Sequence, residues 1–427
     1  MDAVDRTHGL WRATASSGPA DPPLCARLEA DVVIVGAGFT GCSAALHVAA
    51  AGRRPVVLEA AEIGFGASGR NVGLVNAGLW VMPDQLPAIL GRTFGERLLR
   101  QLGEAPDLVF GLIQEHGIVC EAKREGTLHC AVGKRGLAEI TERARQWQLR
   151  GADVSILDAA ETVRSVGSNA YAGALLDRRA GTIQPLAYVR GLAHAAIAAG
   201  AVFHSRSGVI GFENLGTRWR VHTPHGSVTA PAVIIATDAY SSEAFSGIAR
   251  GQVKLPYFNF ATAPLPIGLR ESILPGGQGA WDTKRILSSF RLDDSGRLIF
   301  GSVGALRRLG ARIHREWSRR ELHRLFPQLD EIQFEYEWYG MIGMTHDALP
   351  RLHRYGQNVY SMGAYNGRGI GPGTTFGRDL ARLVTDEVAI EDLALPVTPL
   401  SPVSLQTAKS AFYEAGAQIA HFAGARM

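Results

Sequence analysis

Three glycines near the start of the chain have the spacing of a phosphate-binding turn. Gly36, Gly38 and Gly41 follow a β-branched run at 31–35 and precede an alanine-rich segment that ends at residue 52. Glycines at this spacing allow a tight strand-to-helix turn, a close approach of the backbone to a pyrophosphate, and close packing of helix on strand. Unpaired N–H groups and the helix dipole then stabilise the anion. The sequence therefore predicts a dinucleotide site in this turn, which also contains Ala37, Phe39 and Thr40.

An acidic residue stands at the end of the next predicted strand. Glu59 follows the apolar run 55–58 and precedes Ala60, so residues 31–59 form a complete strand–helix–strand unit. A carboxylate at this position accepts hydrogen bonds from a ribose, and its charge repels a 2′-phosphate. We therefore expect a dinucleotide without that phosphate, which leaves both NAD and FAD open.

A second group of small and polar residues follows at 64–71. Without bulky side chains, this backbone can approach a rigid, flat ring, and its polar groups can bind a pyrophosphate and the ring edge. The same composition is typical of a flexible surface loop, but the position just after Glu59 favours a cofactor contact. The candidate contacts are Ala67, Ser68, Arg70, Asn71, Val72, Gly73 and Leu74.

A glycine-rich turn near the C-terminus joins a predicted strand at 358–363 to a predicted helix at 373–384. The positive end of such a helix dipole would stabilise the negative charge that a flavin gains on reduction. A plain linker between a buried strand and a helix rarely contains so many glycines. The candidate contacts in this turn are Asn366, Gly367, Arg368, Gly369 and Ile370.

The remaining segments predict a mixed α/β protein without an internal repeat. Proline-rich residues 1–30 predict an extended arm, which Trp11 would hold against the body. Helices are predicted at 95–118, 134–150 and 315–326, and strands at 126–132, within 218–240 and within 251–304.

The bulk composition limits the functions that this protein can have. Its 427 residues, 46% hydrophobic and 20% charged, suffice for a large enzyme core. The net charge of +4 comes from scattered arginines, without the basic run of a nucleic-acid-binding protein. The four cysteines lack a CxxC pair and metal-ligand spacing, so we expect no metal. No signal peptide and no apolar stretch of roughly 18 residues is evident, so we expect a cytoplasmic protein without a transmembrane segment.

Several short motifs, in order along nearly the whole chain, resemble the D-amino-acid-oxidase/glycine-oxidase superfamily of FAD-dependent enzymes. Its γ-glutamylputrescine-oxidase-like branch is the most similar. By this resemblance, Val209 presents its backbone to the adenine of FAD, and Thr237 also contacts the cofactor. The motifs are the arm with Trp11, GAGFTG at 36–41, GASGRN at 66–71, ATDAY at 236–240, LIFG at 298–301, Leu349-Pro350 and NGRG at 366–369.

The resemblance implies an α/β fold with two domains. A Rossmann-type FAD-binding domain would be assembled from discontinuous segments, and a smaller antiparallel-sheet (α+β) domain would cover the flavin and bind the substrate. The FAD-binding domain is expected at 1–90, 155–250 and 335–427, with the arm at 1–30, and the substrate-binding domain at 91–154 and 251–334.

The resemblance also implies a reaction. A non-covalently bound FAD would take a hydride from the carbon beside the nitrogen of a small secondary amine or amino acid, and water would hydrolyse the resulting imine. The substrate would be an N-substituted glycine or a γ-glutamyl amine, and O2 would be reduced to H2O2. Residues 72–74 are Val-Gly-Leu, where the branch usually has Gly-Gly-Gln, so the floor near the ring is more apolar and the exact amine stays open.

Three other functions remain open. Many small-amine oxidases of the superfamily place a lysine above the flavin on the strand at 297–303, and this chain has none there. The main alternative is therefore a flavin-dependent dehydrogenase that uses an acceptor other than oxygen. The others are a non-catalytic FAD-binding subunit of a larger assembly and an NAD-dependent dehydrogenase.

An arginine could bind an anionic substrate, because its planar guanidinium matches a carboxylate with two parallel hydrogen bonds. The candidates, in order, are Arg291, Arg285 and Arg368, and we expect Arg291→Ala to raise KM for an acidic substrate about tenfold. Cys42 and His129 are interpreted as packed residues, not as points of covalent flavin attachment. The aromatic candidates for enclosing the substrate are Tyr257, Phe258, Phe260, Trp281, Phe290, Trp338 and Tyr339.

Overall fold

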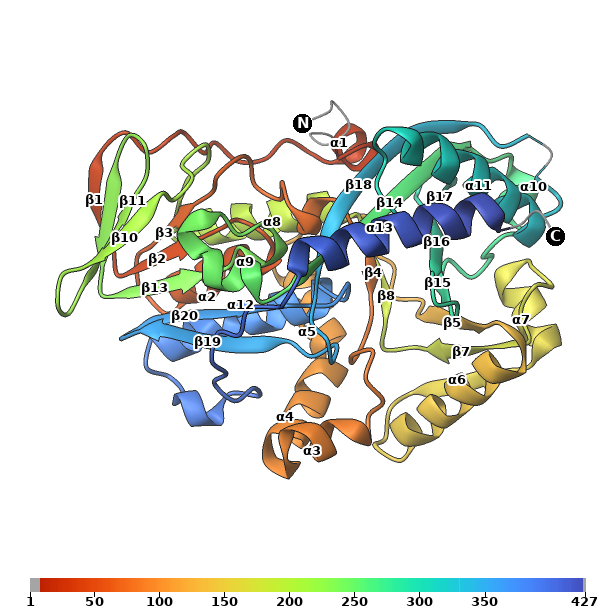
Figure 1. The fold of residues 1–427 in the computed structure, drawn as a ribbon, viewed down its shortest axis with the longest axis horizontal. Helices are drawn as coiled ribbons and strands as arrows, with labels where there is room; N and C mark the ends of the chain where they lie inside the picture. Colours follow the sequence, from red (N-terminus) through yellow and green to blue (C-terminus); the bar gives the residue numbers. More distant parts are fainter. Residues whose placement is uncertain (1–7, 330, 425–427) are drawn as a thin grey trace.

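Three large β-sheets and the helices that cover them form two lobes (Figure 1). The computed structural model describes residues 8–329 and 331–424. A six-stranded and a four-stranded sheet lie at the left of Figure 1, and an eight-stranded sheet lies at the right. The predicted α/β fold class is confirmed.

The six-stranded sheet has the order β19-β20-β13-β2-β3-β9, and β19 is its one antiparallel strand. Strands β2, β3 and β13 are short, apolar and buried along their whole length, as is typical of parallel strands covered on both faces. The strands are β2 (Val32–Val35), β3 (Pro55–Leu58), β9 (Val202–His204), β13 (Ala232–Ile235), β19 (Arg351–Gly356) and β20 (Val359–Gly363).

Alternate side chains of this sheet pack on two different layers. Val33, Val56 and Val233 join a core with the four-stranded sheet, of order β1-β12-β11-β10. Ile34 and Val57 face the opposite layer, where α2 packs against α8 and α12. The elements of the two layers are β1 (Arg27–Glu29), β10 (Gly211–Asn214), β11 (Trp219–His222), β12 (Ser227–Ala230), α2 (Phe39–Ala50), α8 (Pro185–Ala198) and α12 (Ile370–Val384).

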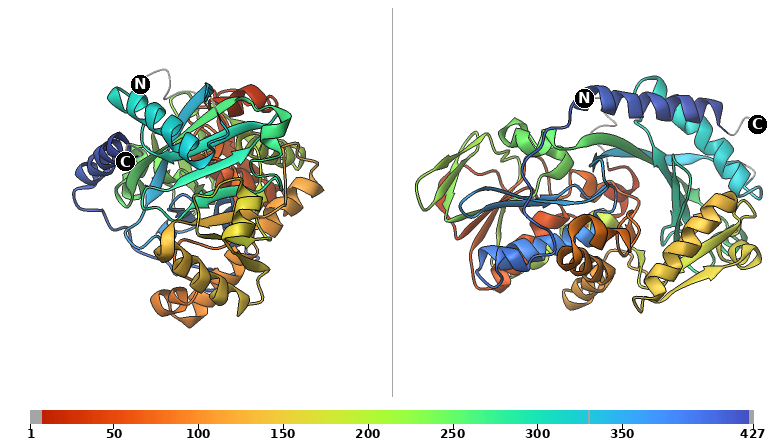
Figure 2. Two further views of the ribbon diagram at one scale, coloured as in Figure 1. Left: turned by 90° about the vertical axis from the view of Figure 1, so that its right-hand side faces the viewer. Right: turned by 60° about the horizontal axis from the view of Figure 1, so that its bottom comes forward.

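The eight-stranded sheet has the order β18-β14-β17-β16-β15-β5-β7-β6, and β15 and β5 are its one parallel pair. Helices α11 and α13 pack together beside β14, and α13 lies along the outside of this lobe (Figure 2). Helices α6 and α7 cover the end formed by β5, β6 and β7. The elements are β5 (Thr127–Ala131), β6 (Val154–Leu157), β7 (Gly173–Asp177), β14 (Val253–Pro264), β15 (Gly279–Asp282), β16 (Ser288–Leu292), β17 (Arg297–Val303), β18 (Phe334–Met344), α6 (Gly133–Gln148), α7 (Ala159–Val166), α11 (Leu309–Leu325) and α13 (Gln406–Ala423).

Short elements connect the lobes. A two-stranded ribbon pairs β4 with β8, and α5 packs against α12 and α8 of the first lobe. The remaining elements are α1 (Leu10–Thr14), β4 (Leu74–Val75), α3 (Gln85–Leu90), α4 (Arg92–Gly103), α5 (Ala105–Glu115), β8 (Gly181–Thr182), α9 (Ser246–Arg250) and α10 (Ile267–Arg270).

Sheet membership differs from the predicted domain boundaries. Strands β6, β7 and β18 belong to the eight-stranded sheet, although most of their residues fall in segments assigned to the FAD-binding domain. The helix predicted at 95–118 is two helices, because Pro106 stands in the first turn of α5 and starts a new helix after Glu104. Both α4 and α5 pack on α12 of the first lobe and not on the eight-stranded sheet. Residues 1–7, 330 and 425–427 of the predicted segments lie outside the described residues.

Trp11 anchors the N-terminal arm in the core between the two lobes. Trp11 is fully buried, and its indole N–H donates to the carbonyl oxygen of Asn71 at 2.8 Å. Its ring packs edge-on against Trp338, with 5.4 Å between the ring centroids. The arm therefore contacts the segment at 64–74 and β18 at once.

We predict that Trp11→Ala lowers the free energy of unfolding by about 3–5 kcal/mol, because it leaves a large cavity and an unpaired carbonyl. Thermal and urea unfolding would measure the loss. Arg12→Ala is the matched control: Arg12 is exposed and pairs with Glu62 at 3.1 Å, a contact worth at most about 1 kcal/mol. Equal stability of the two variants would contradict a structural role for the arm.

Candidate active site

One cavity of about 630 Å³ lies where the carboxyl ends of the parallel strands meet the eight-stranded sheet. Val35, Leu58 and Ala236 line it from the strand ends, and Tyr257 and Val303 line it from the larger sheet. Open parallel sheets bind ligands at this edge, and the volume is in the range of cofactor and small-molecule sites. The predicted cofactor residues line the cavity with two exceptions, Gly41 and Gly73.

The glycine turn leaves no room for side chains. A Cβ on Gly41 would lie 1.8 Å from the carbonyl oxygen of Gly36, and a Cβ on Gly38 would lie 2.8 Å from Ser68 Oγ. Gly36 also has φ of +100°, in the region that favours glycine. Gly38, at the start of α2, has no side chain to cap the helix, although Ser68 Oγ accepts the N–H of Phe39. The positive end of the α2 dipole faces the cavity and can stabilise an anion there.

Glu59 is held at the end of β3 by backbone donors. Its carboxylate accepts hydrogen bonds from the N–H groups of Ala37, at 2.8 Å, and Ala61, at 2.9 Å. Burial raises the pKa of the carboxyl, and these hydrogen bonds oppose that shift. The carboxylate lies on the cavity wall, where it can accept hydrogen bonds from a ribose.

The segment at 64–74 is folded onto the glycine turn. The N–H of Phe39 donates to Ser68 Oγ at 3.0 Å. Asn71 Nδ2 donates to the carbonyl oxygens of Ala67, at 3.1 Å, and Ser68, at 2.9 Å. Gly73 has φ of +88° and faces away from the cavity, so it shapes the segment without lining the site.

The turn before α12 is fixed by two polar side chains. Asp238 accepts the N–H of Ala364 at 2.7 Å, and burial raises the pKa of its carboxyl. Asn366, with φ of 53°, accepts the N–H of Thr345 at 2.8 Å. The lining residues Gly369 and Ile370 then start α12 without a side-chain cap, so its positive end faces the cavity.

The opposite wall of the cavity carries the candidate substrate groups. Tyr257 and Trp281 line it, and the hydroxyl groups of Tyr257 and Ser289 are hydrogen-bonded at 2.7 Å. Arg285, which is exposed, lies between β15 and β16 and lines the cavity. Arg368, which is buried, lines it from the turn before α12. The structure thus brings two of the three predicted arginines to the cavity.

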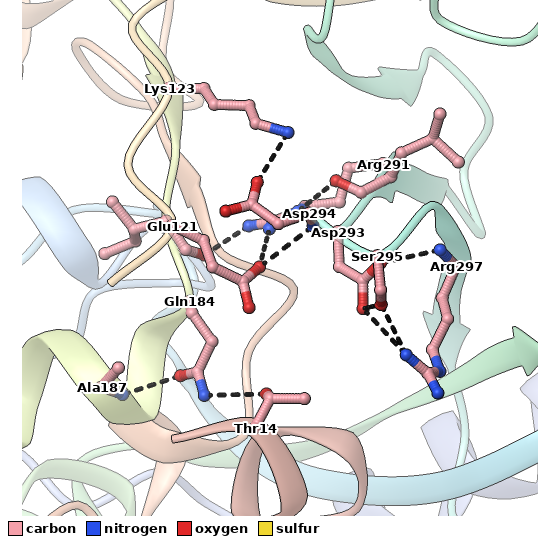
Figure 3. Close-up of polar contacts among 12 residues, drawn as sticks. Thr14, Glu121, Lys123, Gln184, Ala187, Arg291, Asp293, Asp294, Ser295 and Arg297 are labelled. Carbon is pink, nitrogen blue, oxygen red and sulfur yellow. Dashed lines mark hydrogen bonds and ion pairs between the residues drawn. The ribbon is translucent and has the colours of Figure 1, made fainter. Parts of the chain in front are cut away.

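Arg291, the first of the predicted substrate arginines, does not line the cavity. Figure 3 shows the polar contacts that it makes instead. It lies on the same face of β16 as the lining residue Ser289, but two residues further along, where the N-terminal arm fills the space. Its guanidinium is 3.5 Å from the carboxylate of Glu121 and donates to the carbonyl oxygen of Ile183. Arg291 therefore joins the arm to the sheet and has no free face for a substrate.

Most of the predicted aromatic enclosure also lies elsewhere. Phe290 points to the other side of the sheet, where its ring centroid is 5.6 Å from that of Phe326. The remaining candidate rings belong to buried cores and do not line the cavity; they are Phe258, Phe260, Trp338 and Tyr339.

Several lining residues were not predicted from the sequence. Trp80 is the largest of them, and its indole N–H donates to the carbonyl oxygen of Asn366 at 2.7 Å. It lies in a segment without regular structure, so no periodicity in the sequence indicates where its side chain points. Its one signal was an isolated tryptophan shortly after a glycine-rich segment. Other lining residues not singled out are Asn76, Met341, Ile342 and Met344.

Neither residue considered for covalent flavin attachment lines the cavity. Cys42 is buried in α2 and its thiol donates to the carbonyl oxygen of Ala37 at 3.5 Å, while burial raises the pKa of that thiol. His129 is buried on β5, and burial keeps its pKa well below the usual range.

In residues 8–329 and 331–424, no group of three or more histidine, cysteine, aspartate or glutamate residues is placed to bind a metal. None of the helices described is long and apolar enough to cross a bilayer.

Comparison with known proteins gives a consistent result. The family model described as DAO, FAD dependent oxidoreductase, matches residues 31–383. Gamma-glutamylputrescine oxidoreductase of Escherichia coli is 32% identical over 391 residues, which cover 89% of each chain. Probable oxidoreductase OrdL of Haemophilus influenzae is 30% identical over 369 residues, which cover 85% of this chain and 84% of the relative.

Solved structures share the fold at lower identity. Glycine oxidase from Geobacillus kaustophilus superimposes with a TM-score of 0.71 at 20% identity, over 88% of this chain and 99% of the other. L-proline dehydrogenase from P. horikoshii gives a TM-score of 0.71 at 19% identity, over 85% and 95% of the two chains.

We predict that Gly41→Ala abolishes retention of FAD during purification, because the new methyl group forces α2 away from the carbonyl of Gly36. Flavin absorbance per protein chain would measure it. Gly111→Ala is the matched control, since a Cβ there meets no atom within 4 Å. Full flavin content in Gly41→Ala would contradict the assignment of this turn.

We predict that Arg291→Ala lowers the free energy of unfolding by about 3 kcal/mol and leaves KM unchanged. The substitution leaves the largely buried carboxylate of Glu121 without its cationic partner, and Arg291 does not line the cavity. The double variant Arg291→Met/Glu121→Leu should recover most of the loss. Thermal unfolding and steady-state kinetics measure the two effects. A tenfold rise in KM without loss of stability would restore Arg291 to the substrate site.

Proposed function

The chain belongs to the DAO family of FAD-dependent oxidoreductases, and from this premise we propose that it oxidises a C–N bond of a small secondary amine or amino acid. One observation carries the proposal: the cavity that contains the glycine turn and Glu59 is continuous with a wall of the eight-stranded sheet that bears aromatic and cationic side chains. A dinucleotide bound on the first part would therefore meet a small substrate on the second.

The residues of the first part fit FAD. The glycine turn and the positive end of α2 suit its pyrophosphate, and Glu59 suits its ribose. The start of α12 suits the ring edge that gains negative charge on reduction. When bound, FAD supplies the chemistry as the acceptor of a hydride from the carbon beside the substrate nitrogen. We propose that it is held without a covalent bond, because Cys42 and His129 lie off the cavity.

The second part provides orientation and excludes water, but it offers no general base. Among the described lining residues, Glu59 and Asp238 are the only carboxylates, no histidine is present, and both acids lie at the ends of parallel strands. Tyr257 shares its hydroxyl with Ser289, and burial raises the pKa of that phenol. The substrate amine must therefore arrive already neutral, and water must hydrolyse the imine product.

The proposal also names a class of substrate and an electron acceptor. We propose an N-substituted glycine or a γ-glutamyl amine, because Arg285 and Arg368 line the cavity without an acidic partner among the described residues. We propose O2 as the acceptor, which yields H2O2. A flavin-dependent dehydrogenase is the second candidate, favoured by one observation: no lysine is present among the described residues that line the cavity. The four cysteines carry no disulfide, which supports a reducing, cytoplasmic setting.

Oxygen uptake separates the two candidates. We expect the purified, yellow protein to consume O2 and release H2O2 with N-substituted glycines or γ-glutamyl amines. The test is an oxygen electrode with a coupled peroxide assay, across secondary amines, amino acids and γ-glutamyl amines. Substrate-dependent bleaching of the flavin under nitrogen, without oxygen uptake in air, would favour the dehydrogenase. Absence of bleaching with every compound would contradict amine oxidation.

The pH profile tests the absence of a general base. We predict that kcat/KM rises with pH along one limb that follows the pKa of the substrate's own amine, because only the neutral amine reacts. Two substrates whose amine pKa values differ by about 1 unit should give profiles displaced by the same amount. A limb at one fixed pH for both substrates would reveal a titrating protein group.

A further inference from the structure

The outer side of α13 exposes large apolar side chains. Phe412 is 72% exposed and Ile419 is 70% exposed. They are seven residues apart, which is about two turns, so they point to the same side of the helix. Ala408 and Ala415 are exposed on this side as well. These four residues form an apolar strip along α13, and an exposed strip of this kind indicates an interaction surface.

The opposite side of α13 is packed against the lobe and fixes the direction of the apolar strip. His421 is buried, and its ring stacks on Trp317 of α11 with 3.7 Å between the ring centroids. Glu414 accepts a hydrogen bond from Arg307 Nε, just before α11, at 3.0 Å. Helices α11 and α13 therefore run side by side in the same direction, with the strip turned outward.

Helix α11 presents arginines beside the apolar strip. Arg308, Arg312 and Arg319 are exposed, and no carboxylate of the described residues lies within 4 Å of any of them. Among the residues of α11, all of which the structure describes, Glu316 is the one exposed acid. The three arginines form a row with a net positive charge, to which the exposed Lys409 of α13 adds.

This arrangement fits an anionic partner with an apolar interior. In a two-fold dimer the same patch meets itself, so a second copy would set the arginine row against its own arginines or against the apolar strip. Figure 2 shows α13 along the outer edge of the lobe, with α11 next to it. A fluid lipid surface accepts such a projecting ridge without a matching groove.

We propose that the outer sides of α11 and α13 form a membrane-binding face for a bilayer that contains anionic lipids. The apolar strip enters the boundary between headgroups and acyl chains, and the arginine row contacts the lipid phosphates. The protein binds the surface without crossing the bilayer. This inference goes beyond the proposed function and does not depend on it.

The test is cosedimentation of the purified FAD-loaded protein with lipid vesicles. One set contains phosphatidylcholine alone, and the other contains about 30% phosphatidylglycerol as the anionic lipid. We expect the protein to bind the anionic vesicles about tenfold more strongly or better, because each arginine near the surface is attracted to the anionic headgroups. High salt should weaken this binding, because it screens the exposed charges.

A pair of substitutions tests the apolar strip. Phe412→Ser/Ile419→Ser should weaken binding to anionic vesicles about tenfold or more, because it removes the apolar area that enters the lipid. Val119→Ser/Leu149→Ser is the matched control, since these side chains are 83% and 71% exposed and lie outside both helices. The control should bind as the unmodified protein does.

A second pair tests the arginine row. Arg308→Gln/Arg312→Gln should weaken binding to anionic vesicles about tenfold and leave binding to phosphatidylcholine unchanged. Arg53→Gln/Arg92→Gln removes the same charge from exposed arginines elsewhere and should have little effect. Flavin content and melting temperature show that each variant is folded, and all the substituted side chains are exposed.

Three results would overturn the inference. The first is absence of binding to anionic vesicles. The second is an equal loss of binding in a test pair and its control pair. The third is an unmodified protein that is a dimer by analytical ultracentrifugation and becomes a monomer in Phe412→Ser/Ile419→Ser, because the strip would then be a subunit interface. None of the substituted residues lines the cavity, so oxidation of amines by the dissolved variants reports on the proposed function separately.

Discussion

The close contact between Gly41 and the carbonyl oxygen of Gly36 determines how near α2 can lie to the parallel sheet. A single added carbon would lie 1.8 Å from that oxygen, so the backbone itself is the packing surface. Once α2 is placed, α8 and α12 pack on it, and the starts of α2 and α12 both reach the carboxyl edge of the sheet. Two helix N-termini and Glu59 thereby converge on one cavity.

Buried hydrogen bonds join the second lobe to this edge. The carbonyl oxygen of Arg70 accepts hydrogen bonds from Asn259 Nδ2 at 3.1 Å and from the indole N–H of Trp338 at 2.9 Å. These donors stand on β14 and β18, so the eight-stranded sheet holds the backbone of the segment that faces the cofactor. These contacts with the sheet thus fix the distance between cofactor and substrate, which suits a reaction that depends on orientation.

The sequence predicts the cofactor half well, because its signals are local. Glycine spacing, β-branched runs and Glu59 each report on neighbours within about thirty residues, and nearly all of these positions line the cavity. The expected domain boundaries separate β6, β7 and β18 from the other strands of the eight-stranded sheet. Strand partners in this sheet come from distant segments, so their pairing has no local signal in the sequence.

Sequence periodicity does not show which residues line the substrate part of the cavity. Arg291 and Ser289 share a face of β16, yet only Ser289 lines the cavity, because the arm occupies the space above Arg291. Arg368 ranked last among the predicted arginines, since nothing in the sequence shows that it packs against Trp80 and Trp281.

The most direct test of the central claim is a crystal structure of the FAD-loaded protein. We expect FAD along the glycine turn and Glu59, with its ring beside the start of α12 and facing the wall that bears Tyr257. FAD bound away from the glycine turn, or a ring that does not face the eight-stranded sheet, would contradict it.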